Sequence, residues 1–171
     1  MSFTKAKEST IEILLAARRI ADHAMDEGAL GERKAPRAIC EHLGAVLADS
    51  VLQAGLNYTT VVRPRVLTIL RTYPNRDTVS ALLELIEERS TGVFLNWRHH
   101  EKIIRFEMLV AFLKEWDIED VKDLRPHLAS EQFCHAVQSI NGIGPKTVDY
   151  MACLIGIDSI AVDRHVRTFA S

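Results

Sequence analysis

The stretch INGIGPKTVDY, residues 140–150, places two glycines and a proline between two segments whose apolar residues recur at helical spacing. Gly142 and Gly144 flank Ile143, a pattern that allows a sharp turn with positive φ and leaves backbone amides uncovered by side chains. Pro145 then takes the first helical position, where its missing N–H costs nothing. The stretch therefore predicts two helices joined by a bare turn, with the positive end of the second helix facing outward.

Such a bare turn has two interpretations. The exposed amides and the helix dipole can hold a phosphate without a basic patch. An ordinary tight corner between packed helices also favours glycine, so the turn alone does not decide between them. Lys146 and Thr147 follow in the first turn of the second helix, which makes Lys146 the first charged side chain after the turn.

The rest of the chain shows the same helical pattern. Apolar residues recur at i, i+3, i+4 and i+7 in four segments, namely 13–20, 79–86, 133–140 and 148–155. Segments 36–53 and 101–116 fit the same spacing, and Pro64 predicts a helix that begins near Val62, because proline is tolerated in a first turn. No alternating stretch is long enough to indicate a strand. The sequence therefore predicts an all-α fold.

Glycine, proline and polar residues at 26–36, 73–77 and 90–96 indicate loops between these helices. We therefore expect an N-terminal helix over 1–28, a helical body over 36–156 and a return segment over 157–171. A chain of 171 residues can bury a core of its own. Its 47% apolar and 26% charged residues are typical of a soluble globular protein.

The sequence shows no signal for a membrane or for a metal. No apolar run approaches the ~20 residues that cross a bilayer, and the N-terminus lacks the layout of a signal peptide. We therefore expect a cytoplasmic protein without a membrane partner. Cys40, Cys134 and Cys153 are odd in number and far apart, so they indicate neither a disulfide framework nor a metal site.

An aspartate follows Lys146 at a sequence separation that allows the two side chains to lie close together. Asp163 comes seventeen residues after Lys146, in the stretch IAVDRHV. A helix from Lys146 to Gly156 is about 15 Å long, and the six residues after it can reach back about 20 Å if extended. Asp163 can therefore return to the same end of the helix and place a carboxylate beside the amine.

Together, INGIGPKTV and IAVDRHV resemble the helix-hairpin-helix signature and following aspartate of the endonuclease III-like DNA glycosylases. The family's glycines, lysine, threonine, aspartate and histidine fall on Gly142, Gly144, Lys146, Thr147, Asp163 and His165. A weaker similarity lies upstream, where LADSVLQAGLN is similar to the family's helix that ends in a glutamine inserted into the DNA stack. That position is Gln53 here.

The resemblance implies base-excision repair, in which the enzyme flips a damaged nucleotide out of duplex DNA and removes its base. Lys146 would attack the sugar C1′ and form a Schiff base, which permits AP-lyase cleavage of the strand. Asp163 would stabilise the positive charge that develops on the sugar. The implied DNA contacts are at Gln53, Asn141, Gly142, Ile143, Gly144, Pro145, Thr147 and His165.

The implied fold is the superfamily's six-helix barrel, with the N-terminal helix belonging to a second, incomplete helical lobe. The partner would be duplex DNA with a damaged base or an abasic site, bound by a nucleoid-associated monomer with a monovalent cation at the hairpin. Asn141 and Arg164 replace the family's usual proline and threonine. The four cysteines of the family's iron–sulfur cluster are not present, so we expect no cluster and no other cofactor.

Other interpretations stay open at this point. A formal net charge of −2 is unusual for a nucleic-acid binder, which favours a non-catalytic helix-hairpin-helix DNA-binding module over an enzyme. A helical protein-interaction domain is a third interpretation, in which the spacing of lysine and aspartate is a coincidence. Each site residue also has a simpler interpretation. Gln53 can be a solvated residue at a helix end, Lys146 can be a surface lysine that contacts phosphate, and Asp163 can be a helix N-cap without a catalytic role.

Overall fold

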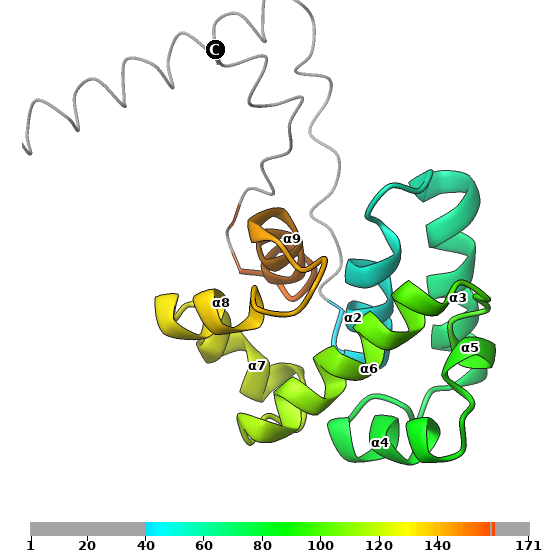
Figure 1. Ribbon diagram of the computed structural model, residues 1–171, viewed down its shortest axis with the longest axis horizontal. Helices are drawn as coiled ribbons and strands as arrows, with labels where there is room; N and C mark the ends of the chain where they lie inside the picture. The colour runs from blue at the N-terminus through cyan, green and yellow to red at the C-terminus, as the bar shows by residue number, and fades with distance from the viewer. Residues whose placement is uncertain (1–39, 158, 160–171) are drawn as a thin grey trace, which may run out of the picture. The chain divides into compact units, whose positions relative to one another are not determined.

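The structure, a computed structural model, describes residues 40–157 and 159 (Figure 1). These residues form α-helices and one π-helical turn and contain no strand, which confirms the all-α prediction for this part of the chain. The elements are α2 (Leu43–Leu52), η1 (Tyr58–Val62), α3 (Arg63–Thr72), α4 (Val79–Glu87), α5 (Thr91–Phe94), α6 (His100–Glu115), α7 (Val121–Leu128), α8 (Glu131–Val137) and α9 (Pro145–Leu154). The predicted helix over 1–28, Asp163 and His165 lie outside the described residues.

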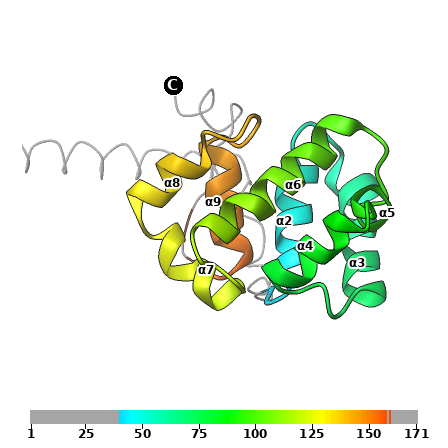
Figure 2. The ribbon, with the colours of Figure 1, turned by 60° about the horizontal axis from the view of Figure 1, so that its bottom comes forward.

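Helices α2 and α6 form the centre of the described body. Every residue of α2 is buried, because its sequence LGAVLADSVL is apolar nearly all round, and it packs against α3, α6 and α9. Helix α6 has 16 residues and runs along the body, with α3 and α5 near one end, α7, α8 and α9 near the other, and α4 alongside it (Figures 1 and 2). This arrangement places α6 between the end of α2 and the hairpin that leads into α9.

Aromatic side chains fill the core along α6. The Phe106 ring is fully buried and lies 5.6 Å from the Phe94 ring, which in turn lies 5.2 Å from Tyr73. Trp116 and Phe133 meet edge to face, with ring centroids 5.1 Å apart. Burial of each such ring stabilises the fold by roughly 1.5–3 kcal/mol, so these contacts hold α6 firmly in place.

Helix α2 begins at Leu43, later than the start predicted at residue 36. His42 caps it: Nδ1 accepts from the Ala45 amide at 3.1 Å, and Nε2 donates to the Tyr73 carbonyl at 2.8 Å. These two bonds are satisfied together by the imidazole that carries its hydrogen on Nε2. The start of α2 therefore depends on a carbonyl 31 residues away, which apolar periodicity does not report.

The α-helix that contains Pro64 begins at Arg63, next to the predicted start at Val62, but a π-helical turn, η1, which was not predicted, precedes it from Tyr58. Asn57 caps this turn through its side chain, which accepts from the Thr60 amide at 3.0 Å. The wide turn bonds Val62 N to Asn57 O at 3.3 Å and runs directly into α3. Pro64 lies in the first turn of α3.

Two further helices were not predicted. Helix α5 is a single turn within 90–96, which we expected to be a loop. Helix α7 contains Pro126, but a capping box formed by Asp120 and Asp123 stabilises its start.

Cys40, Cys134 and Cys153 are partly buried free thiols. In the part of the chain that the structure describes, no helix has the length and apolar character needed to cross a membrane.

Candidate nucleic-acid interface

The hairpin between α8 and α9 has the bare turn that its sequence predicts. Gly142 adopts φ +85°, which L side chains rarely adopt. Ile143 anchors the turn, because its side chain is only 3% exposed and its amide donates to the Ile140 carbonyl at 2.9 Å. Pro145 is the first residue of α9, as predicted, and Gly144 is the N-cap residue.

The two glycines serve different purposes. At Gly142 the positive φ favours a glycine, and a Cβ there would meet the Arg105 guanidinium, which would have to shift. Gly144 has φ −108° and ψ 178°, an extended backbone open to any residue, and a Cβ there would meet no described atom within 4 Å. Neither strain nor neighbours explain Gly144. Its missing side chain leaves the start of α9 uncovered by described side chains at this position.

The first turn of α9 separates an exposed lysine from a buried threonine. Lys146 is exposed, while Thr147 is 5% exposed and its amide donates to the Gly144 carbonyl at 2.9 Å. Among the described residues, no side chain caps the start of α9. The first amides of a helix have no acceptor within the helix, so this end offers N–H groups beside a cationic side chain.

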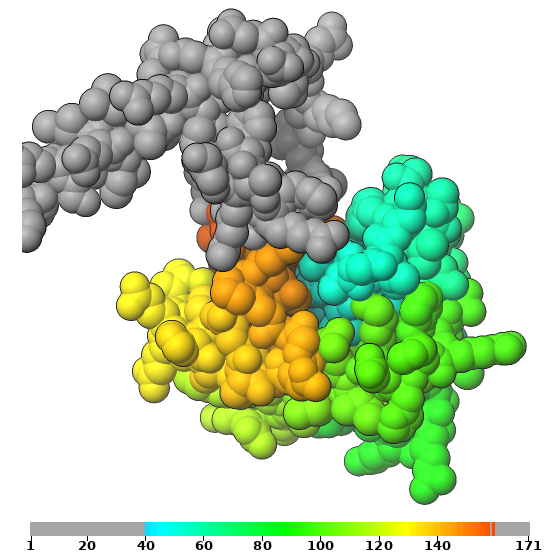
Figure 3. Space-filling view, turned by 45° about the horizontal axis from the view of Figure 1, so that its top comes forward, coloured from blue at the N-terminus to red at the C-terminus, as the bar shows by residue number. Residues whose placement is uncertain are grey.

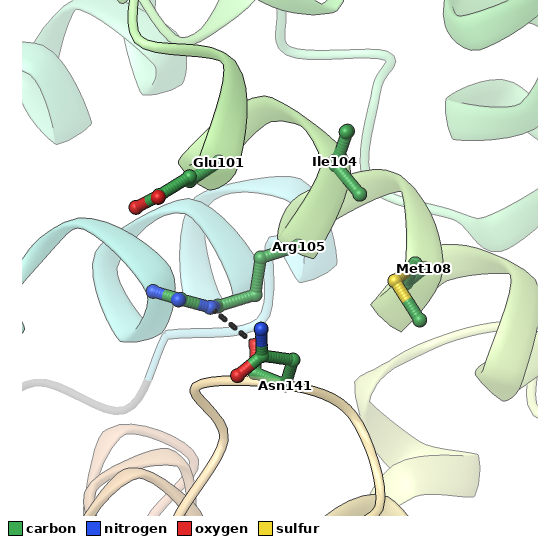
Figure 4. A pocket seen from close by; sticks show the side chains of 5 residues that line it. All are labelled: Glu101, Ile104, Arg105, Met108 and Asn141. Carbon is green, nitrogen blue, oxygen red and sulfur yellow. Dashed lines mark hydrogen bonds between the residues drawn. The ribbon is translucent and has the colours of Figure 1, made fainter.

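Arg105 of α6 contacts the hairpin, and the sequence did not indicate it. Its Nε donates to the Asn141 carbonyl at 2.7 Å, and its guanidinium lies against Gly142 (Figure 4). Beside this contact is a hollow of about 390 Å³, lined by Glu101, Ile104, Arg105, Met108 and Asn141. Figure 3 shows the hairpin and the start of α9, in orange, on one face together with green residues of α6.

Lys102, one turn before Arg105 on α6, holds the end of α2. Its Nζ donates to the carbonyls of Val51 and Ala54, both at 2.9 Å, and to that of Leu52 at 3.4 Å. A cation here satisfies carbonyls that α2 leaves open and offsets the negative end of its dipole. Burial lowers the pKa of Lys102, the positive charge of Arg105 lowers it further, and Glu101 opposes the shift.

Gln53 is the C-cap residue of α2 and lies in the turn whose carbonyls Lys102 binds. Its Nε2 is buried and has no hydrogen-bond partner among the described residues. An unsatisfied buried amide costs about 1–3 kcal/mol, so a new partner for this side chain would be favourable. The side chain would have to rotate outward to reach a base.

Helix α6 thus brings two predicted DNA-contacting segments together. Lys102 binds the backbone around Gln53, and Arg105 binds the backbone at Asn141. These cations stand one turn apart on α6, so the same face of this helix sets the distance between both segments. The predicted site residues Asp163 and His165 fall outside the described residues.

A buried polar cluster links α2 to α9 next to Lys146. The Asp49 side chain is almost wholly buried and accepts from the hydroxyls of Tyr150 at 3.0 Å and Tyr58 at 3.2 Å. Burial raises the pKa of Tyr150 well above its usual value, and the negative charge of Asp49 raises it further. Tyr150 is one turn after Lys146 on α9. The only sequence signal was an acidic residue within an apolar helix.

A second hollow, of about 480 Å³, is lined by Arg65, Asn96, Trp97, Arg98 and His99. The Arg65 guanidinium lies 5.2 Å from the centre of the Trp97 ring, and its Nε donates to the Asn96 carbonyl at 3.1 Å. These contacts hold one cation beside an aromatic ring. Among the residues that the structure describes, no group of three or more His, Cys, Asp or Glu side chains could hold a metal ion.

Comparison of the chain with protein-family models, with curated proteins and with solved structures gives no match. The functional interpretation therefore rests on the hairpin, on the contacts that α6 makes with it, and on the chemistry of Lys146.

Proposed function

We propose that this protein is a helix-hairpin-helix DNA glycosylase with AP-lyase activity, which removes a damaged base from duplex DNA. One observation carries the proposal: an exposed lysine stands in the first turn of α9, next to a glycine that neither its backbone angles nor its neighbours require. A bare helix start favours an anion, and an amine beside it can react with what that anion carries. The six-helix barrel of this superfamily belongs to the same proposal.

The binding step uses the start of α9. A backbone phosphate of DNA accepts hydrogen bonds from the Gly144 and Lys146 amides, because the Ile143 amide is already bonded to Ile140. A monovalent cation between the turn and the phosphate would add to this attraction. The formal net charge of −2 gives no general attraction to DNA, so binding depends on these local groups.

The chemical step uses Lys146. Its neutral amine attacks C1′ of the flipped nucleotide, the C1′–N bond breaks, and the base leaves with the bonding electrons and takes up a proton. The nitrogen lone pair then expels O4′, so the C1′–O4′ bond opens, O4′ takes up a proton and a protonated Schiff base forms. Loss of a proton from C2′ expels the 3′ phosphate and cuts the strand. Asp163 is proposed to accept the proton of the amine and to stabilise the charge on the sugar.

The test is borohydride trapping of the Schiff base. The substrates are duplex oligonucleotides that contain an abasic site, thymine glycol or oxidised guanine. Lys146→Ala is compared with Lys122→Ala, a matched control, because Lys122 is likewise exposed and is the second residue of its helix, α7. We expect a covalent adduct with the wild type and with Lys122→Ala, and none with Lys146→Ala.

Other results separate the alternatives. An adduct of equal yield with Lys146→Ala would exclude this lysine as the nucleophile. DNA binding without any adduct would favour the non-catalytic hairpin module. No binding to any of these duplexes would exclude a DNA function for this turn. The duplex that gives the highest yield of adduct identifies the class of lesion.

A further inference from the structure

The hollow between α6 and the hairpin combines a cation, an amide and exposed apolar side chains (Figure 4). Arg105 and Asn141 supply the polar groups. Ile104 and Met108 supply an apolar wall, and they are 37% and 45% exposed, which is high for side chains of this kind. Glu101 lies at the rim. A ligand that fits this lining carries a negative charge next to a carbon surface.

Arg105 is held in place for such a ligand. The bond from Nε to the Asn141 carbonyl and the contact with Gly142 fix the plane of the guanidinium. A guanidinium has five N–H donors, and this bond uses one of them. Arg105 forms no ion pair with a described carboxylate, although Glu101 lines the same hollow.

The surrounding charge favours an anion as well. Lys102 stands one turn away, and the charge of Arg105 contributes to the lowered pKa of that lysine, after burial. Two cations that repel one another are both stabilised when an anion binds between or beside them. A guanidinium binds a phosphate, like a carboxylate, through two parallel hydrogen bonds in one plane.

We propose that Arg105 and this hollow bind a second backbone phosphate, adjacent along the strand to the phosphate at the start of α9, with its deoxyribose against Ile104 and Met108. This inference rests on the proposed DNA-binding function. It adds that the surface formed by α6 and the hairpin binds two consecutive phosphates of one DNA strand. Asn141 joins the two sites, since its carbonyl orients Arg105 and its chain continues into the turn. Glu101 opposes the phosphate through its negative charge.

The test measures the affinity for an abasic-site duplex by fluorescence anisotropy over a range of salt concentrations. Each phosphate contact contributes about 0.9 to the slope of log K against log salt. We expect Arg105→Ala to lower the affinity and to reduce the slope by about one contact, while Arg105→Lys keeps the wild-type slope because it keeps the charge. Lys114→Ala, at the far exposed end of α6, is the matched control and leaves affinity and slope unchanged.

Glu101→Gln gives a gain that misfolding does not produce: removal of the opposing charge raises the affinity several-fold. Melting temperatures confirm that each variant folds. Arg105→Ala with wild-type affinity and slope would overturn the inference, as would Arg105→Lys with the reduced slope, which would mean that Arg105 only supports the turn. In both cases binding and trapping by the wild type would leave the proposed function standing. A wild type that does not bind the duplex would overturn both.

Discussion

Replacement of Gly144 by aspartate should make the protein more stable and its DNA binding weaker. Gly144 is the N-cap residue of α9, its extended backbone suits any residue, and a Cβ there meets no described atom within 4 Å. An aspartate at an N-cap accepts hydrogen bonds from the next amides of the helix. Those amides include the ones that we assign to the phosphate, so fold and ligand compete for the same donors.

The magnitude follows from three terms. The side-chain cap is worth a few tenths of a kcal/mol relative to glycine. The negative charge at the positive helix end adds about 0.3–1 kcal/mol, and the loss of glycine's freedom in the unfolded chain adds about 0.4–1 kcal/mol. The free energy of unfolding should therefore rise by about 1–2 kcal/mol. The affinity for DNA should fall by at least about tenfold, because one charge-assisted contact becomes a repulsion.

The assay combines urea unfolding, followed by circular dichroism, with anisotropy on an abasic-site duplex. Gly144→Ala is the control, since it adds a methyl group but neither a cap nor a charge. We expect the alanine variant to share only the gain from the unfolded chain, and the aspartate variant to be more stable than the alanine variant and to be the one that loses affinity. Wild-type affinity in a stabilised Gly144→Asp protein would refute the assignment of these amides to phosphate. A less stable variant would refute the geometry of the cap.

Two further predictions concern residues that hold the site. Burial raises the pKa of Tyr150 above its value of about 10 in the unfolded chain. The protonated hydroxyl therefore contributes its full stabilisation of the fold below pH 10, and this contribution is lost as the pH rises from 10 toward the pKa of Tyr150 in the folded protein. Tyr150→Phe should lower stability by about 1–3 kcal/mol near neutral pH, because Asp49 loses a partner, and should make the fall above pH 10 shallower in urea unfolding at pH 8–11. Lys102→Met should destabilise the end of α2 by about 1–3 kcal/mol, because three carbonyls lose their donor. It should also reduce base flipping, measured by 2-aminopurine fluorescence in the duplex, more than it reduces affinity; equal losses of both would contradict a role in positioning Gln53.

Long helices with regular spacing were the part of the fold that the sequence predicted well. Helix α6 spans His100–Glu115 against a prediction of 101–116, because sixteen residues carry several turns of consistent apolar spacing. Short elements were missed. Helix α7 has eight residues and a proline inside it, and α5 has a single turn, so neither has enough residues to show a period.

The hairpin was also predicted in detail, because its geometry depends on neighbouring residues. The positive φ of Gly142 and the helical start at Pro145 both follow from local backbone sterics. One expectation is refined: the turn needs a positive φ at Gly142 but not at Gly144, whose φ is negative. We assign the lack of a side chain at Gly144 to access of a ligand to the start of α9.

The sequence by itself thus determined that the described part of the chain is all-helical and that a bare turn leads to a lysine at the start of a helix. The tertiary structure alone decided what surrounds that turn: Arg105 reaches Asn141 across 36 residues, and Asp49 reaches Tyr150 across 101. The physical reason is that backbone angles and helical periodicity are properties of adjacent residues. Contacts between helices depend on how each helix is rotated and displaced, which the packing of the whole core sets.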